Sequence, residues 1–141
     1  MSAKKKIYKL NTNSCNYILI GIASHQNDYR LTWALNDKLN YNFIKTKDLV
    51  VYDSKLKVER SFVTYYLSDK PELNCYLIAN KSEQGFLLSN MKNIDFILKI
   101  SYDESVEFIK DLLIKLREID VVMIAFILES LLDKQFKIFD F

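Results

Sequence analysis

The segment Tyr17–Ala23 constrains the fold most strongly, because nearly every side chain in it is apolar. A strand of this composition is covered on both faces or lies centrally in a sheet. The polar residue Ser24 ends the run. With 141 residues, the chain has the size of one domain. We therefore expect a single domain over residues 1–141, with a core that needs neither metal nor disulfides.

Two other stretches have the periodicity of helices. Residues 29–39 follow a cluster of candidate capping residues, and their apolar stripe consists of Leu31, Ala34, Leu35 and Leu39. Tyr29 and Trp33 project from nearly the opposite side of this helix, where a domain with one helical layer meets water. A second helix is expected to begin at residues 101–104, with apolar positions at Val106, Ile109, Leu113 and Leu116.

Alternating apolar side chains predict the remaining strands. These strands are expected at residues 7–10, 49–52, 60–67, 75–79 and 94–100. In the last of them, Asp95 and Lys99 share one face, which predicts a surface ion-pair network together with Asp103 and Glu104.

The run Ile119–Leu128 has two interpretations. Its branched side chains favour a buried strand, whereas the absence of a Gly or Pro break permits a helix that continues to Leu132. We expect the strand. The complete pattern then predicts an α+β fold, in which a single mainly antiparallel sheet of about six or seven strands has two helices packed on one face.

Composition argues against several classes of protein. Twenty Lys and Arg against 18 Asp and Glu give a net charge of +2, below the strongly basic surface of a dedicated nucleic-acid domain. Cys15 and Cys75 lie far apart and the chain has one histidine, so we expect reduced, buried thiols and neither metal nor another cofactor. No apolar run reaches the roughly 20 residues that span a bilayer, and the N-terminal residues lack the apolar core of a signal peptide. We expect a cytoplasmic protein without a membrane partner.

Residues 24–36 and 87–100 resemble the IPExxxVDY family of small proteins from Bacteroidota. The motif that names this family corresponds to Leu88–Phe96, where Asp95 is identical and Ser89 and Asn90 replace the family's Pro and Glu. The resemblance implies a bacterial cytoplasmic protein, and it carries over no activity, cofactor or catalytic residue.

The junction between the strand at 17–23 and the following helix contains the best candidate for a ligand site. Ser24, His25, Asp28 and Arg30 cluster there, where main-chain N–H groups and the helix dipole favour an anion. The same residue types are common helix caps, and no glycine-rich loop is present that would let a phosphate approach the main chain. The chain also has no GxSxG, HExxH, Walker or dinucleotide-binding motif. We therefore expect no catalytic residues and no enzyme activity, and we place an enzyme or ligand-binding protein third among the possible functions.

A second hypothesis concerns RNA. Basic residues are interspersed with tyrosines, a mixture that single-stranded RNA binders use for phosphate contact and base stacking. The residues of this lysine and tyrosine surface are Lys4, Lys5, Lys6, Lys9, Lys45, Lys47, Lys55, Lys57 and Arg60, with Tyr8, Tyr52 and Tyr66. Lysines at strand edges also protect against aggregation, and strand aromatics usually belong to the core. An RNA-binding accessory protein is therefore the alternative function.

Exposed aromatic residues favour a third hypothesis, which we place first. Tyr29 and Trp33, together with Phe139 and Phe141, supply more aromatic surface than one sheet with a single helical layer can hide. The simplest interpretation packs the last residues back on their own domain; the others place them on a second copy or on a different protein. We predict a non-enzymatic protein-interaction or adaptor module that associates with itself.

Overall fold

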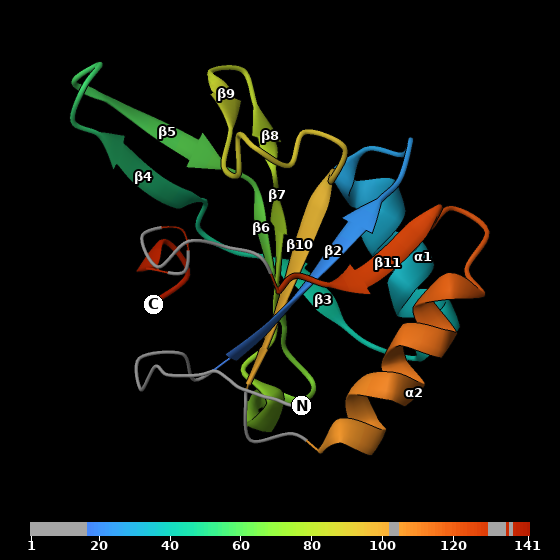
Figure 1. Cartoon of the computed structure of the whole chain (residues 1–141). Coiled ribbons are helices and arrows are strands. Elements are labelled where there is room, and N and C mark those ends of the chain that lie inside the picture. The colour runs from blue at the N-terminus through green and yellow to red at the C-terminus, as the bar shows by residue number, and fades with distance from the viewer. Residues whose placement is uncertain (1–16, 102–104, 130–134, 136) are drawn as a thin grey trace.

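The computed structural model describes residues 17–101, 105–129, 135 and 137–141, and it is an α+β protein built on a six-stranded sheet (Figure 1). All strand pairs in this sheet are antiparallel. The strands in spatial order are β11 (Ile124–Ile127), β2 (Tyr17–Ala23), β10 (Phe96–Ser101), β7 (Tyr76–Ala79), β6 (Thr64–Leu67) and β3 (Phe43–Lys45). The predicted fold class is confirmed. The strand expected at residues 7–10 lies outside the described residues.

Outside the main sheet, the described residues also form two β-hairpins, two α-helices and a 3-10 turn. The strands form two hairpins, β4 (Leu49–Asp53) with β5 (Val58–Phe62), and β8 (Lys81–Ser82) with β9 (Gly85–Phe86). The helices are α1 (Asp28–Leu39) and α2 (Val106–Arg117), and a 3-10 turn covers Pro71–Leu73. None of the described helices is long and apolar enough to cross a bilayer.

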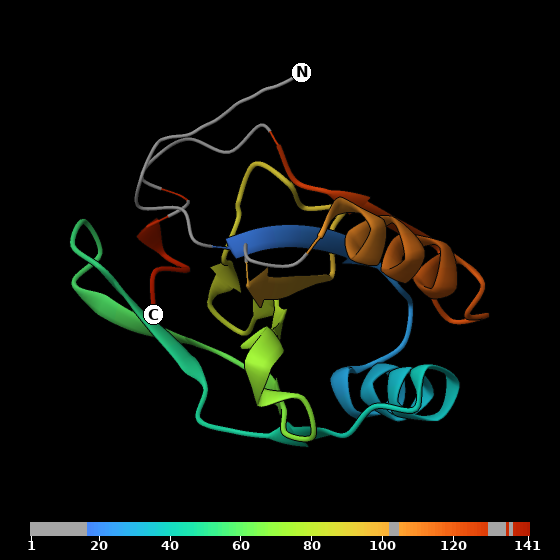
Figure 2. The same cartoon turned by 90° about the horizontal axis from the view of Figure 1, so that it is seen from below.

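Both α-helices cover the same face of the sheet, as predicted (Figure 2). Leu31 and Leu35 of α1 and Leu116 of α2 are buried in one apolar cluster with Ile20 and Ile22 of β2. Ser105 caps α2 by accepting a hydrogen bond from the Phe108 N–H at 3.0 Å. The expected helix start at residues 101–104 falls largely on residues 102–104, outside the described part of the chain.

The opposite face of the sheet is also covered, although neither α1 nor α2 lies there. Leu19, Ile78 and Ile97 point into a second buried cluster, whose cover is supplied by Phe62 of the β4–β5 hairpin and by Leu87, Leu88, Leu128 and Phe139. Figure 2 shows the hairpin and residues 137–141 on the side away from the helices. The sheet is thus buried on both faces, which explains the nearly continuous apolar composition of β2.

Phe139 corrects one prediction. Its side chain is 0% exposed, so Phe139 is a core residue and not part of an interaction surface. The simplest interpretation of the 137–141 segment, that it packs back on its own domain, is confirmed for this residue. The prediction failed because it counted only the helices as cover and left out the β4–β5 hairpin and the loop before β10.

Gly21 lies at the centre of β2, beneath two large side chains of this second cluster. A Cβ atom at this position would be 2.9 Å from Leu128 Cδ2 and 3.1 Å from Ile94 Cδ1. Those distances are shorter than ordinary van der Waals contacts. Glycine at this position therefore lets the side chains of Leu128 and Ile94 pack directly on the main chain of β2.

The strand expected over residues 60–67 is two strands that belong to different sheets. β5 ends at Phe62 and β6 begins at Thr64, whose hydroxyl donates to the Phe62 carbonyl at 2.9 Å and accepts from the Leu49 N–H at 3.1 Å. A side chain that bonds the main chain in this way competes with ladder hydrogen bonds. The alternating pattern continues through the bend, so periodicity did not reveal it. The expected strand within Ile119–Leu128 is confirmed as β11.

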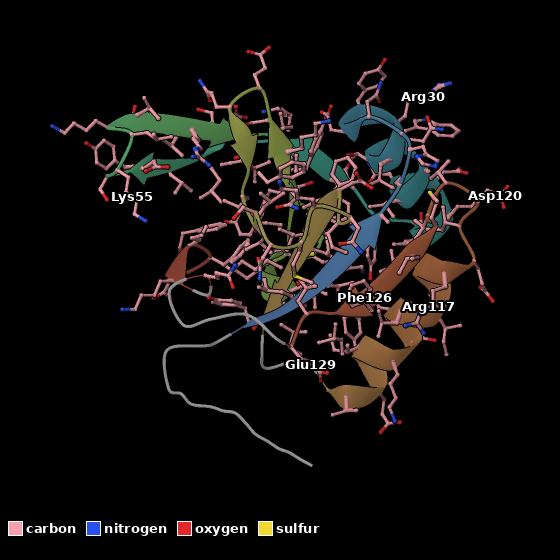
Figure 3. The ribbon with its side chains drawn as sticks, turned by 45° about the horizontal axis from the view of Figure 1, so that its top comes forward. Arg30, Lys55, Arg117, Asp120, Phe126 and Glu129 are labelled. Carbon is pink, nitrogen blue, oxygen red and sulfur yellow. The ribbon has the colours of Figure 1, made fainter. Side chains whose placement is uncertain are left out.

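At each edge of the main sheet, one helix side chain bonds the main chain of the edge strand. Phe43 in edge strand β3 directs its N–H and C=O away from β6, and the Asn36 amide accepts from the first at 2.8 Å and donates to the second at 3.2 Å. At the other edge, Arg117 Nε donates to the Ala125 carbonyl of β11 at 2.9 Å. Figure 3 shows Arg117 beside β11. These bonds occupy main-chain groups that could otherwise pair with a strand of another molecule.

Candidate interaction surface

Helix α1 presents two aromatic side chains to solvent. Tyr29 is 64% exposed and Trp33 is 70% exposed, and their spacing of four residues makes them neighbours on the helix surface. Their predicted exposure is therefore confirmed. Phe141, the other exposed aromatic of the prediction, is 50% exposed but lies on the opposite side of the sheet, in the 137–141 segment.

The position of α1 is fixed at both ends, so the two rings sit on a stable support. Asn27 caps the start by accepting the Arg30 N–H at 3.1 Å, and Asn40, in the left-handed conformation, ends the helix with its N–H bonded to the Asn36 carbonyl. The inner face of α1 is buried in the core through Leu31 and Leu35. The outer face is therefore held in place without any contribution from Tyr29 or Trp33.

Two charged residues flank the aromatic pair. Arg30 and Asp37 are both exposed, and Figure 3 shows Arg30 directed outward from α1. The described part of the chain forms three ion pairs, Lys45 with Asp48, Arg60 with Asp53 and Lys115 with Asp111, and none involves these two residues. Each charge thus remains available to a partner molecule.

The structure brings Ser24 and Asp28 into hydrogen bonds that tie the 24–30 junction to the rest of the domain. The Ser24 N–H donates to Asp95 Oδ2 at 2.8 Å, and Ser24 Oγ accepts from the Gln26 N–H at 3.2 Å. Asp28 Oδ2 accepts from the Tyr65 hydroxyl at 2.7 Å. Burial, followed by this carboxylate, raises the pKa of Tyr65 to about 12.

The remaining residues of that junction do not complete an anion site. His25 and Arg30 are exposed, while the Asn27 side chain already accepts the N–H of Arg30 in the first turn of the helix. The Asp28 carboxylate lies in the first turn, where its negative charge opposes the approach of an anion. The geometry of the junction is explained by helix capping.

The lysine and tyrosine surface is divided among several environments. Lys45 pairs with Asp48 and Arg60 pairs with Asp53, so two of its cations are neutralised within the chain. Lys55 lies at the tip of the β4–β5 hairpin, which projects from the body of the protein (Figures 1 and 3). Lys4, Lys5, Lys6, Lys9 and Tyr8 lie outside the described residues.

Lys99 is the residue that sequence reasoning misjudged. It is 2% exposed in the middle of β10, so the predicted surface ion-pair network with Asp95 is wrong. Its Nζ donates to the main-chain oxygen of Phe141 at 2.7 Å and lies 3.6 Å from the centroid of the Phe141 ring. The rings of Tyr17 and Tyr76 lie 5.0 and 5.6 Å away. An ammonium surrounded by aromatic faces is stabilised by cation–π attraction.

This environment alters the chemistry of Lys99. Burial lowers its pKa to about 8, while the nearby Asp140 carboxylate acts in the opposite direction. A pocket of about 160 Å³ adjoins the amine and is lined by Tyr17, Asn74, Lys99, Ser101, Asp140 and Phe141. Because the amine already bonds Phe141, its observed role is to hold the 137–141 segment against the sheet. The sequence of β10 does not reveal this role, since the aromatic neighbours of Lys99 come from other segments of the chain.

The described residues offer neither a metal-binding cluster nor a reactive thiol. They contain no group of three His, Cys, Asp or Glu side chains that could hold a metal ion. Burial raises the pKa of the Cys75 thiol, which makes it a poor nucleophile. Cys15, the other thiol expected to be buried, lies outside the described part.

Comparisons with protein-family models, curated proteins and solved structures found no match to this chain.

Proposed function

We propose that this protein is a non-enzymatic protein-interaction module and that its contact surface is the outer face of α1. The observation that carries the proposal is the exposure of Tyr29 and Trp33 side by side on a helix anchored by other residues. Tyr and Trp are enriched among the residues that dominate binding energy at protein interfaces. A partner that covers these two rings would bury apolar surface, and binding would not have to offset the cost of ordering the helix.

The helix side chains that already bond both edge strands support a side-chain surface over strand addition. The Asn36 side chain bonds the N–H and C=O of Phe43, and the Arg117 side chain bonds the C=O of Ala125. A partner strand would have to displace these hydrogen bonds before it could pair. The cytoplasmic location, self-association and membership of the IPExxxVDY family remain predictions of the sequence.

Capture from a native lysate tests this function. The wild-type protein is immobilised beside a Tyr29→Ala/Trp33→Ala variant and a Tyr52→Ala control, which removes an exposed ring from the β4–β5 hairpin. Captured proteins are quantified by mass spectrometry, with and without nuclease, and circular dichroism checks folding. We expect the α1 variant alone to lose its specific partners. Equal capture by the folded α1 variant and the wild type would overturn the proposal.

RNA binding remains the second candidate because of the β4–β5 hairpin. Its tip presents Lys55 and Lys57, and exposed Tyr52 lies on the adjoining strand β4. This combination suits a phosphate backbone and one stacked base. The test is a salt titration with single-stranded RNA, since phosphate contacts must weaken steeply as salt rises. Binding that is unchanged by Lys55→Glu and Lys57→Glu would exclude the hairpin as an RNA site.

A further inference from the structure

We propose that the partner of α1 is a second copy of this chain, with the two α1 helices packed antiparallel about a two-fold axis near Trp33. The inference rests on the proposed function, because it uses the same face of α1 and names what covers it. It is carried by the order of charges along that face.

Four of the five exposed residues of α1, Tyr29, Arg30, Trp33 and Asp37, form one stripe, and the fifth, Lys38, lies farther round the helix from Trp33. Arg30 lies three residues before Trp33 and Asp37 lies four residues after it, so all three side chains share one side of the helix. Along the axis, Arg30 stands about 4.5 Å to one side of Trp33 and Asp37 about 6 Å to the other. The stripe therefore has an aromatic centre, a positive end and a negative end.

A two-fold axis converts this polarity into complementarity. When two such stripes meet antiparallel with their Trp33 rings in the middle, Arg30 faces the partner's Asp37, and Asp37 faces the partner's Arg30. A parallel arrangement would instead place Arg30 against the partner's Arg30, which is repulsive. An isologous contact of this kind is the usual geometry of a homodimer. Arg30 and Asp37 have no ion-pair partner in residues 17–101 or in the rest of the described chain.

The interface is small, which sets the expected strength. Twelve residues make a helix about 18 Å long, and one pair of such helices buries less than the roughly 1,200 Å² of a standard interface. The dimer should therefore be weak and reversible. Its formation should depend on protein concentration over the micromolar range.

Charge reversal tests the pairing directly, using the full chain in sedimentation equilibrium. Arg30→Asp and Asp37→Arg each place like charges opposite one another twice in a homodimer, so each variant should weaken dimerisation by about tenfold or more. An equimolar mixture of the two variants restores both attractive pairs, and it should recover dimers that contain one copy of each. Lys110→Asp, an exposed reversal on α2, serves as the control and should dimerise like the wild type.

Both reversals leave the helix itself favoured. An acid near the first turn and a base near the last turn complement the helix dipole, so loss of dimers would not reflect a weakened helix. Circular dichroism on each variant checks that α1 is retained. Trp33→Ala provides a further variant, and it should abolish dimers both alone and in mixtures with either charge variant.

The results separate this inference from the proposed function. A wild type that dimerises while the mixture stays monomeric would overturn the antiparallel pairing, and so would a wild type that stays monomeric throughout. In either case, loss of a different captured protein by the Tyr29→Ala/Trp33→Ala variant would leave the proposed function intact. Recovery of dimers in the mixture alone would establish the pairing.

Discussion

The side-chain amide of Asn36 forms two hydrogen bonds with the main chain of Phe43, accepting at 2.8 Å and donating at 3.2 Å. This single amide satisfies both outward groups of an edge-strand residue. The same helix that exposes Trp33 to solvent thus also occupies the main-chain groups of Phe43 at the edge of the sheet.

Replacing Asn36 with Ala should open that edge. The Phe43 N–H and C=O would lose their partners, and we expect the free energy of unfolding to fall by about 1–2 kcal/mol. The open edge should also increase aggregation on heating. Urea denaturation and light scattering measure the two effects. Asn93→Ala, an exposed substitution in the loop before β10, serves as the control. Identical behaviour of the two variants would show that the Asn36 bonds contribute nothing.

Trp33→Ala should leave the fold almost intact, because its side chain makes little contact with the core. We expect a change in the free energy of unfolding within about 0.5 kcal/mol. Leu35→Ala, on the inner face of the same helix, should cost about 2–5 kcal/mol because it leaves a cavity. Chemical denaturation compares the two. A loss of several kcal/mol in Trp33→Ala would mean that this ring supports the core, and the surface hypothesis would fail.

Lys99 should make the stability of the protein depend on pH. Folding lowers its pKa from 10.5 to about 8, so between these values the unfolded chain binds one proton more than the folded chain. Stability from this group is lowest below pH 8 and rises as the pH increases toward 10.5. Tyr65 and Cys75 act in the opposite direction at high pH, because folding raises their pKa values.

The Lys99→Met variant isolates this effect. From pH 7 to 9.5, the wild type should gain on the order of 1 kcal/mol relative to the variant, because contributions from Tyr65 and Cys75 are common to both proteins. Urea denaturation at a series of pH values gives the difference. A constant difference across this range would show that Lys99 titrates as an ordinary surface lysine.

The 137–141 segment should be held mainly by Phe139. Phe139→Ala removes a fully buried ring and should cost about 3–5 kcal/mol. Phe141→Ala removes the nearest ring from the Lys99 ammonium but keeps the main-chain oxygen, so we expect a loss of about 1 kcal/mol. Denaturation gives both values. A larger effect from Phe141 than from Phe139 would contradict the arrangement.

Much of the fold followed from local patterns. The run at Tyr17–Ala23 predicted a strand that is covered on both faces or central in the sheet, and the apolar stripe of α1 predicted which side of that helix is exposed to solvent. Both depend on the character of neighbouring residues in the sequence. The bend at Thr64 could not be predicted in this way, because the Thr64 hydroxyl bonds the main chain while the alternation of apolar side chains continues unchanged.

The environment of Lys99 and the burial of Phe139 depend on strands that are distant in sequence. Lys99 meets Tyr76 of β7 and Phe141 of the 137–141 segment, and no pattern within β10 announces these neighbours. Phe139 is covered by Phe62 and Leu88, which belong to a hairpin and a loop. Sequence periodicity shows that a face is apolar, but it does not show which segment will lie upon it.

Gly21 is in contact with two segments that do not pair with each other, one just before β10 and one just after β11. Ile94 precedes β10 and Leu128 follows β11, yet both rest on the same position of β2. Adding one methyl group there would lift both side chains at once. A larger residue at position 21 would therefore disturb the packing before β10 and after β11 together.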